Sequence, residues 1–415
     1  MTHRIVIVGA GAAGMAAGMF LRARGERPLI VEARDRVGGR AHTDTSAFGM
    51  PVDLGCGWLH SADVNPWTRY ARAQGFDVIE RDPIWRRRIG ARLTTPEEQS
   101  KWTAAWERNE ALIAASVRSG NDLAVSDVVP RDEFRPMWDA IMTWLMGADS
   151  EYVSCVDFDR YADTERNWPV GQGLGSVVAH AAQSLDVRLQ TQVTDVDWSG
   201  PRITLRTSRG TIECEFVIVT VPTTVLANDS IRFHPALPPS YAEAFAGVPL
   251  GVANKVFFTM EEGALPFDGT TNFIGTDLTA RTASYAVRPS GSDVLLAYFG
   301  GSLARELERR GELESFARDE LKSIFGEEFV RRIRGSVQTS WATDRFAAGS
   351  YSVALPGKAH LREQLSEPVG GKLYFAGEAN SIDHFGTIHG AWESAVAAAE
   401  RVLAGDIESR REGPE

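Results

Sequence analysis

The stretch that decides the fold is "RIVIVGAGAAGMAAGMFL", residues 4–21. A short apolar run typical of a buried strand leads directly into GxGxxG, formed by Gly9, Gly11 and Gly14, and a helix-forming segment follows. In this arrangement the first glycine permits a tight turn, the second lets the backbone approach a pyrophosphate, and the third lets helix and strand pack closely. Because the amino-terminal end of a helix favours negative charge, the stretch predicts a dinucleotide-binding turn.

An acidic residue follows where such a site needs one. Glu32 ends the second predicted strand, "PLIVEA", where a carboxylate can hydrogen-bond a ribose diol. Next, "ARDRVGGR" (33–40) offers a second close backbone approach at Gly38 and Gly39 and a cation at Arg40. A simple nicotinamide dehydrogenase has no evident use for this second turn, although the segment alone would pass for an ordinary basic turn. The candidate cofactor contacts from this part of the chain are Gly9, Gly11, Ala13, Gly14, Glu32, Ala33, Arg34, Gly38, Gly39 and Arg40.

Composition limits the class of protein. The chain has 415 residues, 43% of them hydrophobic and 24% charged, which predicts a folded protein of two domains. A net charge of −11 argues against nonspecific nucleic-acid binding and is compatible with cationic ligands. Cys56, Cys155 and Cys214 form no CxxC pair, so we expect no disulfide, no metal site and a reducing compartment. The uncharged segment 5–21 is interrupted by glycines, so we interpret it as folded structure and expect a cytoplasmic protein without a membrane partner.

Strand and helix patterns alternate along the rest of the chain. From about residue 187 the pattern is mainly that of strands, and an Ala-rich helix closes the chain. This alternation predicts a nucleotide-binding domain made of separate pieces, with a second domain inserted between them. Helices are expected at 66–118, 134–147, 302–334 and 387–403, and strands at 187–222, 249–300 and 372–378.

One lysine interrupts an otherwise apolar strand. The segment "PLGVANKVFF" (249–258) contains Lys255 among residues typical of a half-buried strand. Taken alone, such a lysine more often turns its ammonium to solvent, because burial needs a partner or a function that offsets the desolvation.

Four further stretches resemble one family. They are "LGCGWLHSADVNPW" (54–67), "PLGVANKVFF" (249–258), "SWATDRFAAGSYSVALPG" (340–357) and "LYFAGEANSIDHFGTIHGAWESAVAAAERV" (373–402). With the glycine turn, they resemble, in order and over the whole chain, the flavin-dependent amine oxidases, which include monoamine, polyamine and spermine oxidases and histone lysine demethylases. The inserted domain carries no motif that we can match, and it decides the substrate.

The resemblance implies an α/β fold, in which a discontinuous Rossmann-like domain binds FAD and an inserted α+β domain binds the substrate. It places the flavin ring at the interface between the two domains. The boundaries that we expect are 1–66, 166–234 and 336–405 for the FAD-binding domain, 67–165 and 235–335 for the substrate-binding domain, and 406–415 for a polar tail.

The resemblance also implies further FAD contacts. Glu378 matches the acid that contacts the ribityl chain, and Val193 matches a position whose backbone meets the adenine. The helix that begins at Thr387 is expected to aim its amino-terminal end at the flavin ring. Ser350 replaces the cysteine that attaches the flavin in covalent monoamine oxidases, so the FAD is expected to be noncovalent. The contacts implied in this way are Gly55, Cys56, Gly57, Trp58, Val193, Gly377, Glu378, Thr387 and Ile388.

Five residues are expected to serve catalysis. Lys255 matches the lysine that faces flavin N5 through a water, and Trp341 and Tyr351 match the aromatic walls. His60 either hydrogen-bonds the substrate or is a structural histidine. Thr387 replaces the second tyrosine of the monoamine oxidase cage, which weakens that assignment.

Residues 171–176, "GQGLGS", form no second GxGxxG, which argues against an NADPH-dependent monooxygenase. This loop either contacts FAD or connects the domains.

The resemblance predicts oxidation of an amine by O2 to an imine and hydrogen peroxide, with a polyamine or related secondary amine as substrate. The alternatives are an L-amino-acid oxidase, which would need an arginine for the carboxylate, a monoamine oxidase, and a flavoprotein that acts mainly as a binding module. The sequence leaves the oligomeric state open.

Overall fold

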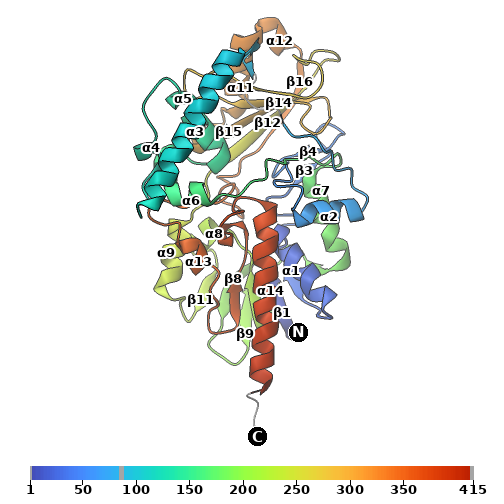
Figure 1. Cartoon of the computed structure of the whole chain (residues 1–415). Helices are drawn as coiled ribbons and strands as arrows, with labels where there is room; N and C mark the ends of the chain where they lie inside the picture. Colours follow the sequence, from blue (N-terminus) through green and yellow to red (C-terminus); the bar gives the residue numbers. More distant parts are fainter. Residues whose placement is uncertain (1, 84–87, 412–415) are drawn as a thin grey trace.

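Two β-sheets, each with its own helices, make up the chain, and the computed structural model describes residues 2–83 and 88–411. In Figure 1 the first sheet lies in the lower half, beside the long helix α14 (Ile388–Arg411), and the second lies in the upper half. Segments far apart in the sequence contribute to each sheet. The predicted α/β class, with one domain inserted into another, is confirmed.

The first sheet surrounds the strand that carries the glycine turn. Strand β1 pairs in parallel with β2 and β10, in the order β11-β8-β9-β10-β1-β2-β7, and β17 pairs with β10. The turn therefore follows the carboxyl end of a central parallel strand, where ligands bind in such sheets. The strands are β1 (Thr2–Val8), β2 (Leu29–Val31), β7 (Asp186–Arg188), β8 (Val193–Asp197), β9 (Ile203–Thr207), β10 (Gly210–Val219), β11 (Arg232–His234) and β17 (Leu373–Phe375).

Both faces of this sheet are covered, which explains the unbroken apolar run of β1. Ile5 and Ile7 pack on one face with helices α1, α2, α7 and α14, and Val6 and Val8 pack on the other with α9 and α13. The helices on these faces are α1 (Ala12–Ala23), α2 (Pro66–Ala73), α7 (Leu174–Ala181), α8 (Thr223–Ala227), α9 (Pro239–Gly247), α13 (Leu361–Gln364) and α14, with short turns η2 (Ala182–Ser184) and η3 (Glu378–Asn380).

The second sheet is mainly antiparallel, in the order β16-β12-β15-β14-β13-β5-β6. On one face Val256 and Phe258 pack against α10 and α11, so Lys255 lies on the other face. The strands are β5 (Arg88–Ile89), β6 (Arg92–Leu93), β12 (Ala253–Met260), β13 (Thr271–Ile274), β14 (Ser284–Val287), β15 (Val294–Gly300) and β16 (Ile333–Gln338), and β3 (Thr43–Asp44) and β4 (Val52–Asp53) form a separate pair. The helices of this half are α3 (Pro96–Arg118), α4 (Val125–Val128), α5 (Arg135–Met146), η1 (Ser150–Tyr152), α6 (Cys155–Arg160), α10 (Gly301–Arg310), α11 (Leu313–Phe325) and α12 (Glu327–Arg331).

Three predicted helices differ from the structure. The region 66–118, of which 84–87 lie outside the described residues, contains two strands between α2 and α3. The predicted helix 302–334 is three helices, because Gly311 and Gly326 adopt positive φ values of 69° and 88° that end α10 and α11. Helix α14 continues to Arg411, beyond the expected end at residue 403.

The division into domains remains our proposal, with three adjustments. Helix α2 packs on the first core through Trp67, and α9 packs there through Tyr241 and Phe245, so both belong with the FAD-binding domain. Strand β16 pairs with β12 and belongs with the second sheet.

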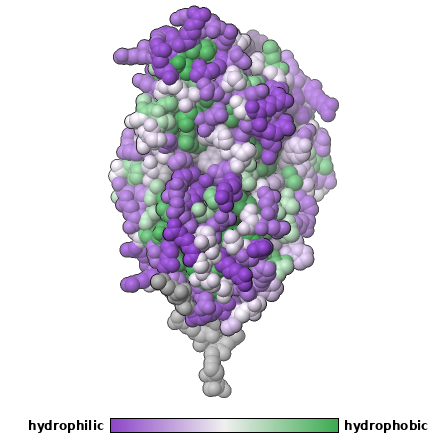
Figure 2. All heavy atoms as spheres, turned by 180° about the vertical axis from the view of Figure 1, so that it is seen from behind, coloured by the Kyte–Doolittle hydropathy of each residue, from purple (hydrophilic) through white to green (hydrophobic). Residues whose placement is uncertain are grey.

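Figure 2 shows a face of the molecule on which hydrophilic residues predominate, with apolar areas between them. Within residues 2–83 and 88–411, no helix combines the length and the apolar character that crossing a membrane requires.

Candidate active site

A cavity of about 1480 Å³ lies between the two sheets and is continuous from the glycine turn to strands β12–β15. It is lined by every predicted site residue except Gly14. A Cβ at Gly14 would lie 1.9 Å from the Gly9 carbonyl oxygen, so this glycine is needed for the close contact of helix and turn. Gly14 therefore supports the turn by close packing, and its contact with the cofactor remains a prediction.

The glycine turn leaves helical amides available to a ligand. Gly9 has a φ of 110°, and Gly11 is the N-cap of α1. Within the described part of the chain, no side chain caps this helix, and its first turn has no acidic residue. Ala12 and Ala13 line the cavity at this point. Because the first amides of a helix have no partners inside the helix, the turn fits the pyrophosphate of FAD.

Glu32 ties this turn to the following strand. Its two carboxylate oxygens accept hydrogen bonds from the Ala10 and Arg34 amides, both at 2.8 Å. A carboxylate has about four acceptor positions, so Glu32 can still accept from a ribose diol. The guanidinium of Arg34 is less available, because it forms a two-bond ion pair with Asp344 at 2.9 and 2.5 Å.

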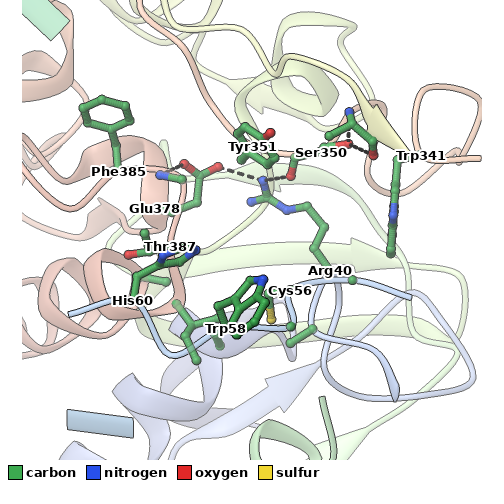
Figure 3. Close-up of a pocket in the computed structure, with 18 of the residues that line it drawn as sticks. Arg40, Cys56, Trp58, His60, Trp341, Ser350, Tyr351, Glu378, Phe385 and Thr387 are labelled. Atoms are coloured by element: carbon green, nitrogen blue, oxygen red, sulfur yellow. Dashed lines mark hydrogen bonds and ion pairs between the residues drawn. The ribbon is translucent and has the colours of Figure 1, made fainter. Parts of the chain in front are cut away.

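An ion pair between the partly exposed Arg40 and the buried Glu378 holds the far end of the predicted FAD site. Arg40 donates to Glu378 and to the Ser350 carbonyl, both at 2.7 Å. Figure 3 shows this guanidinium between the two acceptors, with Trp341 on one side and Thr387 and His60 on the other. The other Glu378 oxygen accepts from the Ser352 hydroxyl at 2.5 Å and from the Gly386 amide at 2.9 Å.

The charge state of Glu378 follows from these contacts. Burial by itself would raise the pKa of Glu378, but Arg40 and the Ser352 hydroxyl outweigh it and lower the pKa, so the carboxylate stays ionised. It therefore holds Arg40 and the turn at Gly386 together. Its contact with the ribityl chain remains a prediction.

Lys255 is buried and fixes the loop that includes Gly55. Its ammonium donates to the Asp53 carbonyl at 2.8 Å and to the Gly55 carbonyl at 2.5 Å. Trp341 Nε1 donates to the Leu54 carbonyl at 3.1 Å, so two predicted catalytic side chains anchor one backbone segment. Burial lowers the pKa of Lys255, and the nearby Asp53 carboxylate opposes this shift.

The neighbouring glycine and thiol positions are set by packing. A Cβ at Gly55 would lie 1.6 Å from the Arg40 carbonyl oxygen. Burial raises the pKa of the Cys56 thiol to about 12, so this cysteine is an inert part of the wall.

The "GQGLGS" loop (171–176) holds the Asp53 side chain, next to the backbone segment that Lys255 and Trp341 anchor. The Asp53 carboxylate accepts from the Leu174 and Gly175 amides at the start of α7, at 2.9 and 3.2 Å. A Cβ at Gly175 would lie 2.3 Å from the Thr43 amide nitrogen. The glycines of the loop do not line the cavity, so its role is to pack α7 against β3 and β4.

The aromatic wall contains a tyrosine that the sequence motifs did not indicate. Tyr351 donates to the Trp144 carbonyl at 2.6 Å, and the Tyr298 and Tyr351 hydroxyls are 2.9 Å apart. A carbonyl only accepts, so Tyr351 uses its single proton there and Tyr298 donates to Tyr351. The Tyr298 oxygen therefore keeps its lone pairs for an incoming donor. Burial raises the pKa of Tyr298 to about 12, so the hydroxyl stays protonated.

His60 and Thr387 lie at the opposite wall. His60 Nδ1 is 2.5 Å from the Asn167 side-chain oxygen, and burial lowers the pKa of His60. The neutral ring therefore donates through Nδ1 and keeps Nε2 as an acceptor. The Thr387 hydroxyl donates to the His384 carbonyl at 2.7 Å and accepts from the Gly390 amide at 3.0 Å, so it caps α14.

A cluster of ionisable residues surrounds this helix start. The ligand atoms of His384, His389 and Glu393 lie within 4.8 Å of one another. Glu393 accepts from His384 at 2.8 Å and lies 3.1 Å from His389 Nε2. Among the described residues His389 Nδ1 is buried without a partner, and a metal on Nε2 would leave an unpaired N–H there. We therefore interpret the cluster as a hydrogen-bonded ion pair.

This cluster predicts a pH-dependent contribution to stability. Hydrogen bonding to Glu393 raises the pKa of His384, and the two imidazoles lower the pKa of Glu393 to about 2. The stabilisation is complete between about pH 4.5 and 6.5, is lost as pH falls from 4.5 toward 2, and is lost as pH rises through the raised pKa of His384.

We expect Glu393→Gln to lower the free energy of unfolding by about 0.5–1 kcal/mol near pH 6, because the partly exposed pair is screened by solvent. The loss should be smaller at about pH 9, where His384 is neutral. Urea unfolding at the two pH values measures this, with Glu400→Gln on the same helix as the control. An equal loss at both pH values would contradict the assignment.

These features define a class of enzyme, a flavoprotein oxidoreductase in which an aromatic chamber adjoins a dinucleotide site. Residues 12–403 match the family described as flavin containing amine oxidoreductase, and the chain belongs to that family. It is therefore an FAD-dependent amine oxidase, and its FAD is held noncovalently.

Similar proteins cover nearly the whole chain. Polyamine oxidase 4 of Oryza sativa subsp. japonica is 28% identical over 95% of this chain and 88% of its own length. Probable polyamine oxidase 4 of Arabidopsis thaliana is 30% identical over 95% of this chain and 86% of its own. Two solved structures share the fold. Cyclohexylamine oxidase from Brevibacterium oxydans IH-35A has a TM-score of 0.82 at 20% identity, over 98% of this chain and 99% of that chain. Putrescine oxidase bound to putrescine has a TM-score of 0.80 at 19% identity, over 97% and 99%.

Proposed function

We propose that the protein oxidises an amine to an imine, which water hydrolyses to an aldehyde or ketone, while O2 is reduced to H2O2. A polyamine or a related secondary amine is the favoured substrate. The observation that carries the proposal is the continuity of the cavity, which joins the glycine turn to a chamber walled by Lys255, Trp341 and Tyr351. Bound FAD supplies the acceptor for the hydride equivalent that leaves the amine carbon and the donor of electrons to O2.

The side chains of the chamber suit a neutral amine. Apolar aromatic walls lower the pKa of an amine, and the neutral form has the lone pair that assists loss of hydride. The lone pairs of Tyr298 and His60 can accept N–H bonds from it. Lys255 is the one lysine that lines the described cavity, and it can supply a proton at its Nζ atom.

The charge of the outer wall supports a cationic substrate. Glu110 on α3, Asp159 on α6 and Asp163 line the cavity on the side of these helices. Together with the net charge of −11, they favour the approach of a cation. Several relatives are named polyamine oxidases, which agrees with this preference.

The arginines of the cavity favour an amine over an amino acid. A substrate carboxylate needs an arginine free to pair with it. The cavity-lining arginines of the described chain all have partners. They are Arg34 with Asp344, Arg40 with Glu378, Arg166 with Asp82, and Arg345 with Gln192. We therefore favour amine oxidation over L-amino-acid oxidation.

The visible spectrum of the purified protein tests the proposal. The flavin absorbance should bleach anaerobically with spermidine, spermine or N-acetylspermine, and peroxide should form when O2 is readmitted. An arylalkylamine and several L-amino acids serve as comparison substrates. Bleaching by amino acids alone would replace the proposal with an amino-acid oxidase, and no bleaching by any amine would overturn it.

Tyr298→Phe should weaken amine binding. The substitution removes only the hydroxyl that we expect to accept an amine N–H, so the dissociation constant of the amine should rise by about tenfold with little change in the limiting rate of reduction. Anaerobic stopped-flow reduction measures both quantities. Tyr374→Phe is the matched control, because the Tyr374 hydroxyl bonds Gly371 outside the cavity. Equal dissociation constants for the variant and wild type would contradict the role of Tyr298.

A further inference from the structure

A buried carboxylate lies behind the strand that carries Lys255. Glu308 belongs to α10, which packs against β12, and the residue is 9% exposed. Its two oxygens accept four hydrogen bonds, from the Asn254 side chain at 2.7 Å, from the Ala342 amide at 3.1 Å, and from the Thr343 amide and hydroxyl, both at 2.7 Å. A carboxylate has about four acceptor positions, so these donors use its full capacity.

Asn254 extends this arrangement to the neighbouring segments. It is completely buried, on the face of β12 opposite to that of Lys255. Its amide nitrogen donates to Glu308, and its oxygen accepts from the Thr339 hydroxyl at 3.0 Å and from the Trp341 amide at 3.2 Å. The Thr339 hydroxyl in turn accepts from the Lys255 amide at 2.8 Å. One buried network therefore joins the backbone of Lys255 to that of Trp341.

Lys255 and Trp341 are held from both sides of the sheet. On the cavity side, Lys255 Nζ and Trp341 Nε1 both donate to the backbone of residues 53–55. On the far side, the segments that carry these two side chains meet at Asn254 and Glu308. The donors to Glu308 are all neutral groups, and a charge buried in this way is costly, whereas an apolar side chain would pack the helix at lower cost. The geometry that Glu308 imposes on residues 339–343 accounts for its presence.

We propose that Glu308 is a positioning residue for amine oxidation, which fixes the spacing of Lys255 and Trp341 at the cavity wall. This inference rests on the proposed function, because it takes the flavin ring to lie against these two side chains. Glu308 does not line the described cavity, so it acts only through the residues that it holds. Reacting groups need accurate placement, and a displacement of about 1 Å can slow a reaction by about 10²-fold.

Glu308→Gln tests this role in the FAD-loaded enzyme with little change in side-chain volume. The amide nitrogen of glutamine cannot accept, so the donors on one side of the side chain lose their acceptor. Anaerobic stopped flow with spermidine should show a limiting rate of flavin reduction that is lower by about tenfold or more, with the dissociation constant of the amine changed by less than about twofold. Hydrogen exchange of the Ala342 and Thr343 amides, measured by mass spectrometry, should become about tenfold faster.

Two controls on α10 separate positioning from stability. Glu306→Gln removes a partly exposed carboxylate paired with Arg281 and Arg310, and it should change neither the rates nor the exchange. Leu307→Ala removes a core side chain, so it should destabilise the protein while the folded enzyme keeps its rate constants.

Thr343→Val is a milder variant that removes only the hydroxyl donor to Glu308. It should show the effects of Glu308→Gln in weaker form, and it replaces that variant if Glu308→Gln does not fold. Limiting rates equal to those of the wild type in both variants, whatever the loss of stability, would overturn the proposal. An equal slowing in Leu307→Ala would also overturn it.

Reoxidation by O2 after reduction with dithionite needs no amine, so it tests the positioning independently of the substrate. It should be slower in Glu308→Gln than in the wild type, because Lys255 is displaced. If no amine bleached the wild type, slower reoxidation together with faster exchange at residues 342 and 343 would keep the positioning role and contradict the proposed function alone. Unchanged reoxidation in that case would overturn both.

Discussion

Lys255→Met is expected to slow turnover of the FAD-loaded enzyme by about 10²-fold or more, with FAD binding and the fold retained. The reaction of the reduced enzyme with O2 should show the largest change. The ammonium lies in a buried part of the cavity wall, where burial lowers its pKa. It is therefore a better proton donor than a surface lysine, and methionine of similar length removes it.

The same substitution has a structural cost that can be measured separately. The Asp53 and Gly55 carbonyls both lose their donor, and each buried acceptor left unpaired costs roughly 1–3 kcal/mol. Lys255→Arg keeps donors and charge, so it should restore part of the stability. Lys358→Met, which removes an exposed lysine paired with Glu243, should change neither rate nor stability appreciably.

The pH profile distinguishes the chemical role from the structural one. Because burial lowers the pKa of Lys255, the protonated form is lost at a lower pH than for a free lysine, whose value is 10.5. Wild-type activity should therefore fall as pH rises through this lowered pKa, and Lys255→Met should lack that decrease. Unchanged rates of both half-reactions, measured by stopped flow, would leave Lys255 with a structural role alone.

The part of the site that could be predicted is formed by residues that lie close together in the sequence. Gly9, Gly11 and Glu32 belong to one strand–turn–helix–strand unit, whose geometry depends on residues close together in the chain. The motif resemblance placed Lys255 and Trp341 at the cavity, although it did not indicate that both donate to the backbone of one loop. Those bonds join segments about 200 residues or more apart, which no local pattern specifies.

The residues that sequence reasoning missed depend on strand register. Tyr298 and Asn254 are in runs whose alternation predicts strands but not which face meets the cavity. That face is fixed only when β12, β15, β14 and β13 pair in order. A tyrosine or asparagine in an apolar strand is the one local signal, since such a polar group needs a partner when buried.

The predicted boundaries of the helices were wrong for a different reason. The predicted helix 302–334 has helical periodicity throughout, yet Gly311 and Gly326 end α10 and α11. Glycine is tolerated within helices at a moderate cost, so its position alone does not decide whether a helix ends. Tertiary packing of α10 and α11 on β12 decides it here.

Glu378→Ala should lower the stability of the protein strongly. Removing one partner of a buried ion pair typically costs about 3–5 kcal/mol, and we expect the lower end of this range because the remaining Arg40 is partly exposed. Here Arg40 would keep only the Ser350 carbonyl, and the Ser352 hydroxyl and Gly386 amide would lose their acceptor. The turn that leads into α14 would loosen, and we expect FAD to be lost from the purified protein.

The flavin-to-protein absorbance ratio after gel filtration measures the loss of FAD, and urea unfolding measures the stability. Glu243→Ala removes an exposed acid and should affect neither. The double variant Arg40→Leu, Glu378→Leu provides the decisive comparison, because it removes both charges at once. It should be less destabilised than the sum of the two single substitutions, since no unpaired charge remains buried. Additive losses would instead show that Arg40 and Glu378 act independently, and the ion pair would then not be what holds the loop at Ser350 to the turn at Gly386.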